Sequence, residues 1–263
     1  MKATYALMLA IFCTGIDMYV VAALIPTMAA DLNESVASLA LLVSAYALPA
    51  ALLAPFFGPL SDRFGRRLVM VSGMAFFAVT VAGTAVAPSL EVLVVLRVLN
   101  GLGAAVAMPA MFAYAGDLPT VTQRSRAMSN LAMAFPLASL LGLPLGALLA
   151  GTVSWRATFA AVALLALLAT FLIWRLPADR AKGGSAIGYA EGLRFAIGDR
   201  RVLAVLAVTF IWFLGPFGMF TFVAEHFQST FGLSTSEAVS YTHLRAHETT
   251  ASISYAVFCL KRG

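Results

Sequence analysis

Long stretches without charge alternate with short charged segments along the 263-residue chain. Seven of the stretches are close to or above the roughly 20 residues that an α-helix needs to cross about 30 Å of hydrocarbon. They lack the residue-by-residue alternation of membrane barrel strands. The sequence therefore predicts an all-α transmembrane protein. The expected spans are Thr4–Pro26, Val36–Phe57, Leu68–Ala87, Val92–Tyr114, Asn130–Thr152, Ala157–Trp174 and Val202–Ala224.

Composition excludes several other classes of protein. Hydrophobic residues make up 61% of the chain and charged residues 11%, whereas soluble domains are about 45–50% apolar and about 25% charged. A soluble enzyme, a nucleic-acid-binding domain and a disordered protein are therefore excluded. The two cysteines, Cys13 and Cys259, are too few for a disulfide scaffold or a four-cysteine metal site, and we expect no cofactor and no metal.

The basic residues predict the orientation in the membrane. Twelve lie in one set of loops, whereas the opposite loops up to Ser240 hold only Arg156. Because cytoplasmic loops are enriched in Lys and Arg, we expect a cytoplasmic N-terminus in a plasma membrane, such as a bacterial inner membrane. This distribution explains the net charge of +5 without a nucleic-acid partner. Trp155 and Arg156 are expected at the outer interface, in contact with lipid headgroups.

The segment between the second and third spans combines glycines with one acid and several arginines. It reads Gly58-Pro-Leu-Ser-Asp62-Arg63-Phe-Gly65-Arg66-Arg67. Gly58 would permit a close helix contact, and Gly65 an unusual backbone angle in the turn. Asp62 could face a helix N-terminus or pair with a basic side chain. Arginines that only anchor the topology would not explain this whole spacing.

This segment resembles the signature loop of the major facilitator superfamily, and other segments agree. The fourth span resembles that superfamily's span-4 motif, with Asn100 where Gln is commoner, and it reads Leu93-x-x-x-Arg97-x-x-Asn100-Gly101-x-Gly103. The first span, with Asp17 before Val20, Val21 and Pro26, is similar to that of twelve-span drug:proton antiporters. The fifth span resembles the antiporter motif, except that Leu143 separates the glycine from the proline in Gly142-Leu-Pro144-Leu-Gly146.

The resemblance covers residues 1 to about 240 and implies an N-terminal six-helix half of a major facilitator fold plus a seventh helix. Such proteins move small molecules, often with protons, by alternating access between two halves. The resemblance also implies that Asp117 locks two helix ends together through Arg66 or Arg67; a solvated aspartate at a helix end is the alternative. Gly142, Pro144 and Gly146 would give close packing and a bend, and the resemblance adds control of proton leakage.

Asp17 and Arg97 are the only charges inside the predicted spans. From the outer ends of their spans they lie about 13 Å and about 8 Å deep at 1.5 Å per residue, within reach of one another. A charge at the bilayer centre costs at least about 2.5–3.5 kcal/mol. Our hypothesis is that Asp17 takes up and releases a proton in a cavity shared with Asn100, and that Arg97 tunes its pKa. A static pair, or an Arg97 that reaches the outer surface, is the alternative.

The chain is expected to divide into four segments: a six-span half over 1–175, a cytoplasmic central loop over 176–201, the seventh span and an outer loop over 202–240, and a tail over 241–263. The tail changes character at Tyr241, and we expect it to be foreign sequence joined to a truncated gene. A natural tail of a half-size protein is the alternative. On the first interpretation, transport requires the missing C-terminal half.

We therefore expect a membrane transporter that exports small amphipathic molecules or drugs in exchange for protons. A sugar or metabolite exporter is the alternative within transporters, because the fifth span departs from the antiporter pattern. A membrane interaction module without transport activity is the alternative from another class. We do not expect an enzyme, because the spans offer no paired acids and no set of serine and histidine.

Overall fold

The computed structural model describes residues 2–177, 198–208, 210 and 211. The chain divides into two compact units, Met1–Gly198 and Asp199–Gly263. The described part of the second unit is helical over residues 200–208. Most of the predicted seventh span and central loop, and the whole predicted tail, lie outside the described residues.

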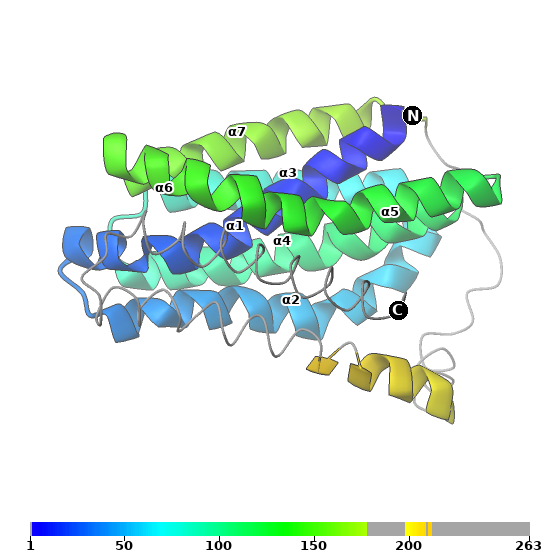
Figure 1. Cartoon of the computed structure of the whole chain (residues 1–263), viewed down its shortest axis with the longest axis horizontal. Coiled ribbons are helices and arrows are strands. Elements are labelled where there is room, and N and C mark those ends of the chain that lie inside the picture. Colours follow the sequence, from blue (N-terminus) through cyan, green and yellow to red (C-terminus); the bar gives the residue numbers. More distant parts are fainter. Residues whose placement is uncertain (1, 178–197, 209, 212–263) are drawn as a thin grey trace, which may run out of the picture. The chain divides into compact units, whose positions relative to one another are not determined.

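The first unit is built entirely of helices over its described residues (Figure 1). Five long helices each cross the unit once, and a sixth crossing is made of three consecutive pieces, one of them π-helical. The helical elements in chain order are α1 (Lys2–Leu32), α2 (Val36–Phe64), α3 (Arg66–Ala85), α4 (Leu90–Gly116), α5 (Val121–Leu137), η1 (Ala138–Gly142), α6 (Leu143–Thr152) and α7 (Trp155–Trp174). The three pieces of the divided crossing are α5, η1 and α6.

Over the described residues, six helical segments are long and apolar enough to cross a membrane, which confirms the first six predicted spans. The helices extend beyond the predicted bounds where polar residues follow the apolar stretch. Helix α1 continues past Pro26 to Leu32, and α2 reaches Phe64. The fifth crossing begins at Val121, nine residues before the predicted Asn130. Charge marks the part of a helix inside hydrocarbon, whereas the helix itself continues until its backbone is capped.

Short polar residues set several helix starts. Ser35, Thr120 and Ser154 precede α2, α5 and α7, and each side-chain oxygen accepts a hydrogen bond from the backbone N–H three residues later, at 3.0–3.2 Å. Such caps satisfy donors that the first helical turn leaves free. Gly65, with φ 93°, separates α2 from α3. This left-handed backbone angle suits glycine, as the sequence analysis predicted.

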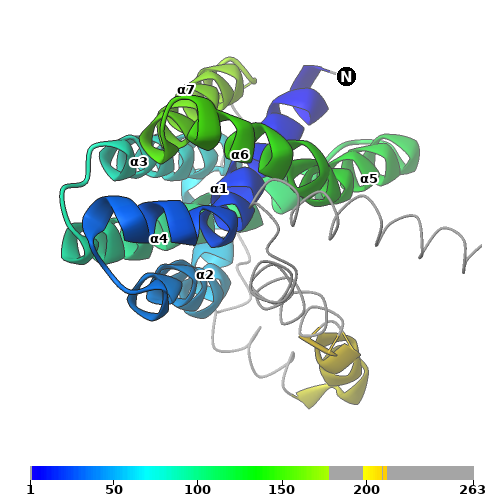
Figure 2. The same cartoon turned by 60° about the vertical axis from the view of Figure 1, so that its left-hand side comes forward.

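Helix α4 packs against both α2 and α3, and α3 packs against α7. Helix α1 contacts α2, α5 and α7, and Figure 2 shows it passing between the α5–α6 side and the α3–α4 side of the bundle. Small residues permit these close approaches. A Cβ at Gly73 would lie 2.8 Å from the backbone nitrogen of Ala107, and one at Gly103 would lie 3.0 Å from the Cα of Phe77.

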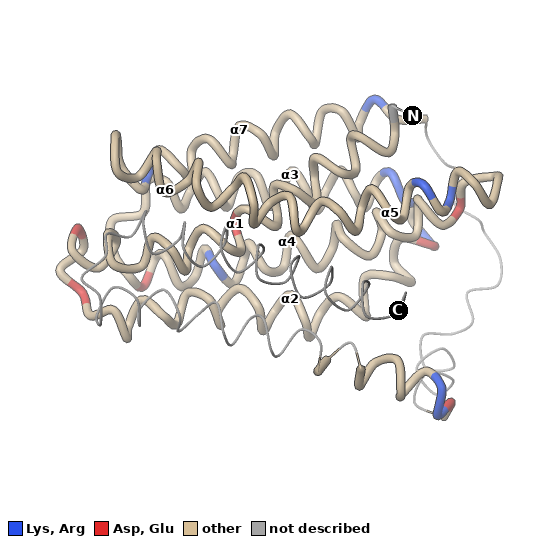
Figure 3. Tube along the Cα trace, viewed as in Figure 1, with Lys and Arg blue, Asp and Glu red and all other residues tan. Residues whose placement is uncertain are grey.

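Charged residues of the first unit gather at the two ends of its helices (Figure 3). Most arginines lie at the end where α5 begins, whereas acids lie at both ends. Asp17 and Arg97 are the exceptions, since both lie inside the bundle and are at most 1% exposed. Large apolar side chains cover much of the outer surface of α2, including Leu48 and Leu52. Such a surface suits lipid rather than water.

Candidate functional site

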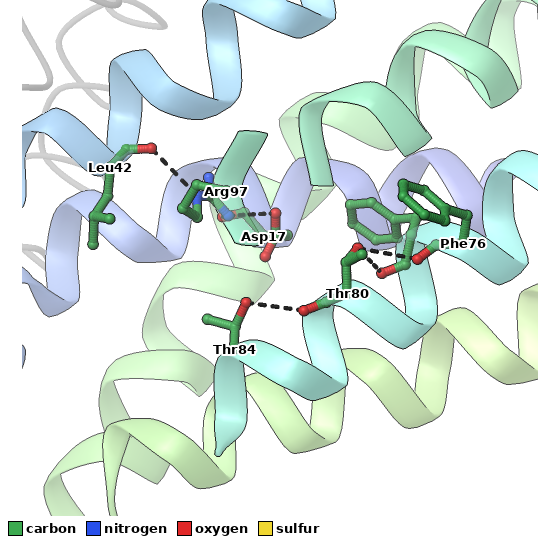
Figure 4. Close-up of polar contacts among 7 residues, drawn as sticks. Asp17, Leu42, Phe76, Thr80, Thr84 and Arg97 are labelled. Atoms are coloured by element: carbon green, nitrogen blue, oxygen red, sulfur yellow. Dashed lines mark hydrogen bonds and ion pairs between the residues drawn. The ribbon is translucent and has the colours of Figure 1, made fainter. Parts of the chain in front are cut away.

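Asp17 of α1 and Arg97 of α4 form an ion pair in the centre of the bundle (Figure 4). The Arg97 Nη1 donates to Asp17 Oδ2 at 2.6 Å, and to the Asp17 backbone carbonyl at 3.5 Å. The structure thus brings together the two charges that the sequence analysis singled out inside the spans. Arg97 points into the bundle rather than toward the outer surface. The contact joins two helices that are 80 residues apart in sequence.

Helix α2 supplies further partners for the Arg97 guanidinium. Its Nε donates to the backbone carbonyl of Leu42 at 3.3 Å, and its Cζ lies 4.6 Å from the centroid of the Tyr46 ring. Tyr46 is 4% exposed. A cation over an aromatic face is attracted by the ring quadrupole. The charge of Arg97 is therefore shared among α1, α2 and α4.

Several buried polar atoms near this pair lack a partner. Within the described part of the chain, Asp17 Oδ1 has no hydrogen-bond partner, and neither do Nδ2 and Oδ1 of Asn100. Asn100 follows Arg97 by almost one turn of α4 and is fully buried. Unpaired buried polar groups are rare because each costs about 1–3 kcal/mol. The site can therefore accept a hydrogen at Asp17 Oδ1 and both donate and accept at Asn100.

Glycines set the spacing of the helices that carry the pair. A Cβ at Gly101 would collide with the Tyr46 backbone carbonyl. Helices α4 and α2 therefore touch next to Arg97 and to the Tyr46 ring that it contacts. A Cβ at Gly146 would collide with the Val20 side chain, and a Cβ at Gly142 would collide with the Ile16 side chain. Gly142 and Gly146 thus lie one turn apart against the segment of α1 that holds Asp17.

Pro144 follows a local change in helix geometry. Residues Ala138–Gly142 form a π-helical turn between α5 and α6. Proline cannot donate to the carbonyl four residues earlier, and its ring crowds that carbonyl. A wider turn relieves this crowding, and π turns occur mostly as single turns inside α-helices. The Thr158 hydroxyl of α7 donates to the Gly146 carbonyl at 3.0 Å and ties the following segment to its neighbour.

The end of the bundle near the α2–α3 turn has its own ionic cluster, formed by Asp62, Arg66 and Asp117. Arg66 pairs with Asp62 one turn earlier, and its Nε lies 3.2 Å from Asp117 Oδ2 after α4. The Arg66 Nη1 also donates to the Ser61 hydroxyl at 2.5 Å. Arg66 therefore links the ends of α2 and α4, one of the two arrangements considered from the sequence.

The neighbouring residues of the turn make other contacts. The Arg67 Nη1 donates to the backbone carbonyl of Leu176 after α7 at 2.9 Å. The Arg63 guanidinium lies 5.5 Å from the ring centroid of Phe64. A Cβ at Gly58 would meet no atom within 4 Å. The expectation of a close helix contact at Gly58 is therefore wrong for the described helices, because α2 faces away from its neighbours there.

A second cluster lies at the opposite end and joins α1 to α7. Asp31 of α1 pairs with Arg156, and the Trp155 indole N–H donates to the same carboxylate at 3.0 Å. Arg156 also donates to the Ala87 carbonyl at 3.3 Å and lies over the Trp155 ring. Trp155 is 2% exposed. Its expected place among lipid headgroups is therefore wrong, because its N–H has a partner inside the protein.

Sequence reasoning missed Tyr46, Leu42 and Asp31. A backbone carbonyl carries no sequence signal, and Tyr46 is one aromatic residue in an apolar helix. Asp31 stands among exposed acids at a helix end, where solvation is the common outcome. Among the described residues, no group of three or more His, Cys, Asp or Glu side chains could hold a metal ion.

The sequence profile of the Major Facilitator Superfamily matches residues 7–260. Similar proteins include the uncharacterized MFS-type transporter YwfA of Bacillus subtilis (strain 168), which is 30% identical over 86% of this chain and 56% of its own length. Multidrug resistance protein 1 of the same organism is 27% identical over 82% of this chain and 54% of its own length. A chloramphenicol resistance protein of Streptomyces lividans is 30% identical over 87% of this chain and 59% of its own length.

Solved structures resemble the chain at lower identity. A D-xylose–proton symporter has a TM-score of 0.67 at 20% identity, covering 99% of this chain and 69% of the symporter. A bacterial homolog of the human lysosomal transporter Spinster has a TM-score of 0.68 at 22% identity, and the match covers 92% of this chain and 58% of the homolog. These likenesses concern the fold. The chain spans about half the length of the curated relatives it matches.

Proposed function

Because the chain belongs to the major facilitator superfamily, we propose that it forms one half of a proton-coupled exporter of small amphipathic molecules. The family and its structural neighbours are transporters rather than enzymes. With six apolar helices among its described residues, the chain is a multi-pass membrane protein. We propose in addition that its N-terminus faces the cytoplasm of a bacterial cell, which would place the α2–α3 turn on the same side.

One observation carries the proposal: the buried carboxylate of Asp17, with one oxygen paired to Arg97 and the other unpaired. A proton added at Oδ1 would neutralise the carboxylate and remove the ionic link between α1 and α4. Loss of the proton would restore that link. Breaking a buried pair is worth about 3–5 kcal/mol, which is enough to bias two arrangements of packed helices.

The cargo follows from chemistry around the site and from the relatives. The site combines the aromatic ring of Tyr46 with unpaired polar atoms of Asp17 and Asn100, a combination that suits an amphipathic molecule. Relatives named for multidrug and chloramphenicol resistance support an export role. The cavity would lie between this half and a second one, so transport by the present chain alone is not expected. A sugar or a metabolite is the other cargo class that the test includes.

The remaining predicted residues receive supporting roles. We propose that the buried, unpaired Asn100 side chain binds cargo or proton-bearing water in the conformation in which the helices around it open. The ion pairs of Arg66 would hold one conformation closed at the end where α2 and α4 meet. Gly142, Pro144 and Gly146 would keep α1 and the fifth crossing tightly packed, which limits proton leakage beside Asp17.

Transport in proteoliposomes tests the proposal. The 263-residue chain and the complete transporter read from the source DNA are reconstituted separately, with trapped pyranine to report internal pH. Ethidium and radiolabelled xylose serve as probes of the two cargo classes. We expect the complete transporter to exchange ethidium for protons, and Asp17→Asn to abolish this exchange.

Asp31→Asn is the matched control, because it makes the same change on the same helix outside the bundle core. It should retain proton-driven exchange. Unchanged proton-driven export by the Asp17→Asn protein would overturn the assignment of the proton site. Exchange of xylose but not ethidium would overturn the proposed cargo class.

A further inference from the structure

Arg97 contacts two helices besides its own, and only one of them supplies an opposite charge. Helix α1 offers the Asp17 carboxylate, at 2.6 Å. Helix α2 offers the Leu42 carbonyl, at 3.3 Å from Nε (Figure 4). It also offers the face of Tyr46, whose ring centroid lies 4.6 Å from Cζ. The α2 partners are uncharged, so they do not change when a proton binds elsewhere.

A neutral Asp17 would leave the guanidinium as an uncompensated charge inside the bundle. Arg97 is 1% exposed, so water does not replace the lost partner. A buried charge without a partner is strongly destabilising. The strength of a cation–π contact rises when the cation is desolvated and unpaired. The ring and the carbonyl on α2 therefore matter most when the carboxylate is neutral.

We propose that Tyr46 is a positioning residue that holds Arg97 on α2 while Asp17 carries a proton. This inference rests on the proposed function only in taking Asp17 to be protonated during the cycle. With a retained Arg97, α1 can separate from α4 without releasing a bare cation into the core. Helix α2 thus offers a second set of contacts that the Arg97 guanidinium keeps when its ion pair with Asp17 is lost.

The surroundings leave few other groups for this role. In the part of the chain that the structure describes, the titratable side chains that interact electrostatically with the pair are Cys13, one turn before Asp17 on α1, and Tyr46 itself. Among the described residues, Asp17 and Arg97 are the only charged side chains that are buried. The tight contact at Gly101 holds α4 close to the α2 backbone at Tyr46.

A double-mutant cycle on the purified 263-residue chain in lipid nanodiscs tests the proposal without measuring transport. Asp17→Asn fixes position 17 in a neutral form, Tyr46→Leu removes the ring, and Tyr46→Phe keeps the ring but removes the hydroxyl. Thermal unfolding is followed by circular dichroism in each background. Tyr5→Leu, on an exposed part of α1, is the matched control.

We expect Tyr46→Leu to lower the melting temperature by on the order of 4 °C more in the Asp17→Asn background than with Asp17 present. Tyr46→Phe should behave like the parent in both backgrounds, because a phenyl face still attracts the cation. Tyr5→Leu should have the same small effect in both. Equal effects of Tyr46→Leu in the two backgrounds would overturn the proposal, whether or not the complete protein transports protons.

The doubly substituted protein could fail to fold, and a third substitution keeps the test decisive. Arg97→Met removes the charge that Tyr46 is proposed to hold. Adding it to the Asp17→Asn, Tyr46→Leu protein should restore a cooperative unfolding transition. If the triple variant is no more stable than the double variant, the defect comes from lost packing at Tyr46, and the proposal fails.

Discussion

A methyl group added at Gly101 would force apart the two helices that hold Arg97. In Gly101→Ala, the new Cβ would lie well inside 3.0 Å of the Tyr46 carbonyl oxygen, closer than real Cβ atoms come to other atoms. The obstacle is backbone, so no side-chain rotation relieves it. Helix α2 would have to retreat by roughly 0.7 Å or more to reach a separation of 3.0 Å. Overpacking of this kind costs about 1–3 kcal/mol, and the better helix propensity of alanine offsets about 1 kcal/mol of it.

The expected net loss is therefore up to about 2 kcal/mol, which corresponds to a melting temperature lower by up to roughly 8 °C for a unit of this size. Gly151→Ala is the matched control, because a Cβ there meets no atom within 4 Å. Its stability should be equal to or above that of the parent. Both variants are compared by thermal unfolding in the same nanodiscs. If Gly101→Ala is as stable as Gly151→Ala, the close α2–α4 contact is refuted.

Three other substitutions test contacts at the ends of the bundle. Asp31→Ala should lower the free energy of unfolding by about 1–3 kcal/mol, because it leaves the buried Trp155 N–H without an acceptor. In chemical unfolding, Asp31→Ala should cost much less when Trp155→Phe is already present, and an equal cost in both backgrounds would contradict the contact. Gly65→Ala should destabilise by at least about 1 kcal/mol, because φ is 93°, whereas Gly58→Ala should not; equal melting temperatures of the two variants would argue against the strained turn. Arg66→Ala should speed tryptic cleavage in the α2–α3 turn, since α2 and α4 lose their ionic link, and an unchanged cleavage rate would show that the link does not restrain the turn.

The sequence predicted the membrane helices well because the cost of a charge in hydrocarbon acts locally. Each span could be found from the distance between charged residues alone, and six were confirmed as apolar helices. Their ends were harder to predict, because capping and helix propensity continue past the hydrocarbon. The start of α5 at Val121 is an example, since its first turn is polar and capped by Thr120.

The candidate site was predictable only where a residue type is rare in its surroundings. Asp17 and Arg97 stand out as charges in apolar helices, whereas Tyr46 and the Leu42 carbonyl do not. The burial of Trp155 and the open surroundings of Gly58 depend on which face of a helix meets a neighbouring helix. That information comes from the three-dimensional packing of helices, because every face of a membrane helix is apolar. Periodicity therefore gives little warning of such contacts.

The π-helical turn at Ala138–Gly142 has a consequence for how the fifth crossing tolerates a change in length. In an α-helix, one additional residue rotates everything after it by about 100°, which would turn Gly146 away from Val20. A π turn takes up one residue more than an α turn and cancels that rotation. Leu143, which stands between glycine and proline where the antiporter motif has none, directly follows this turn. The wide turn thus keeps the helix in register with α1 despite the intervening leucine.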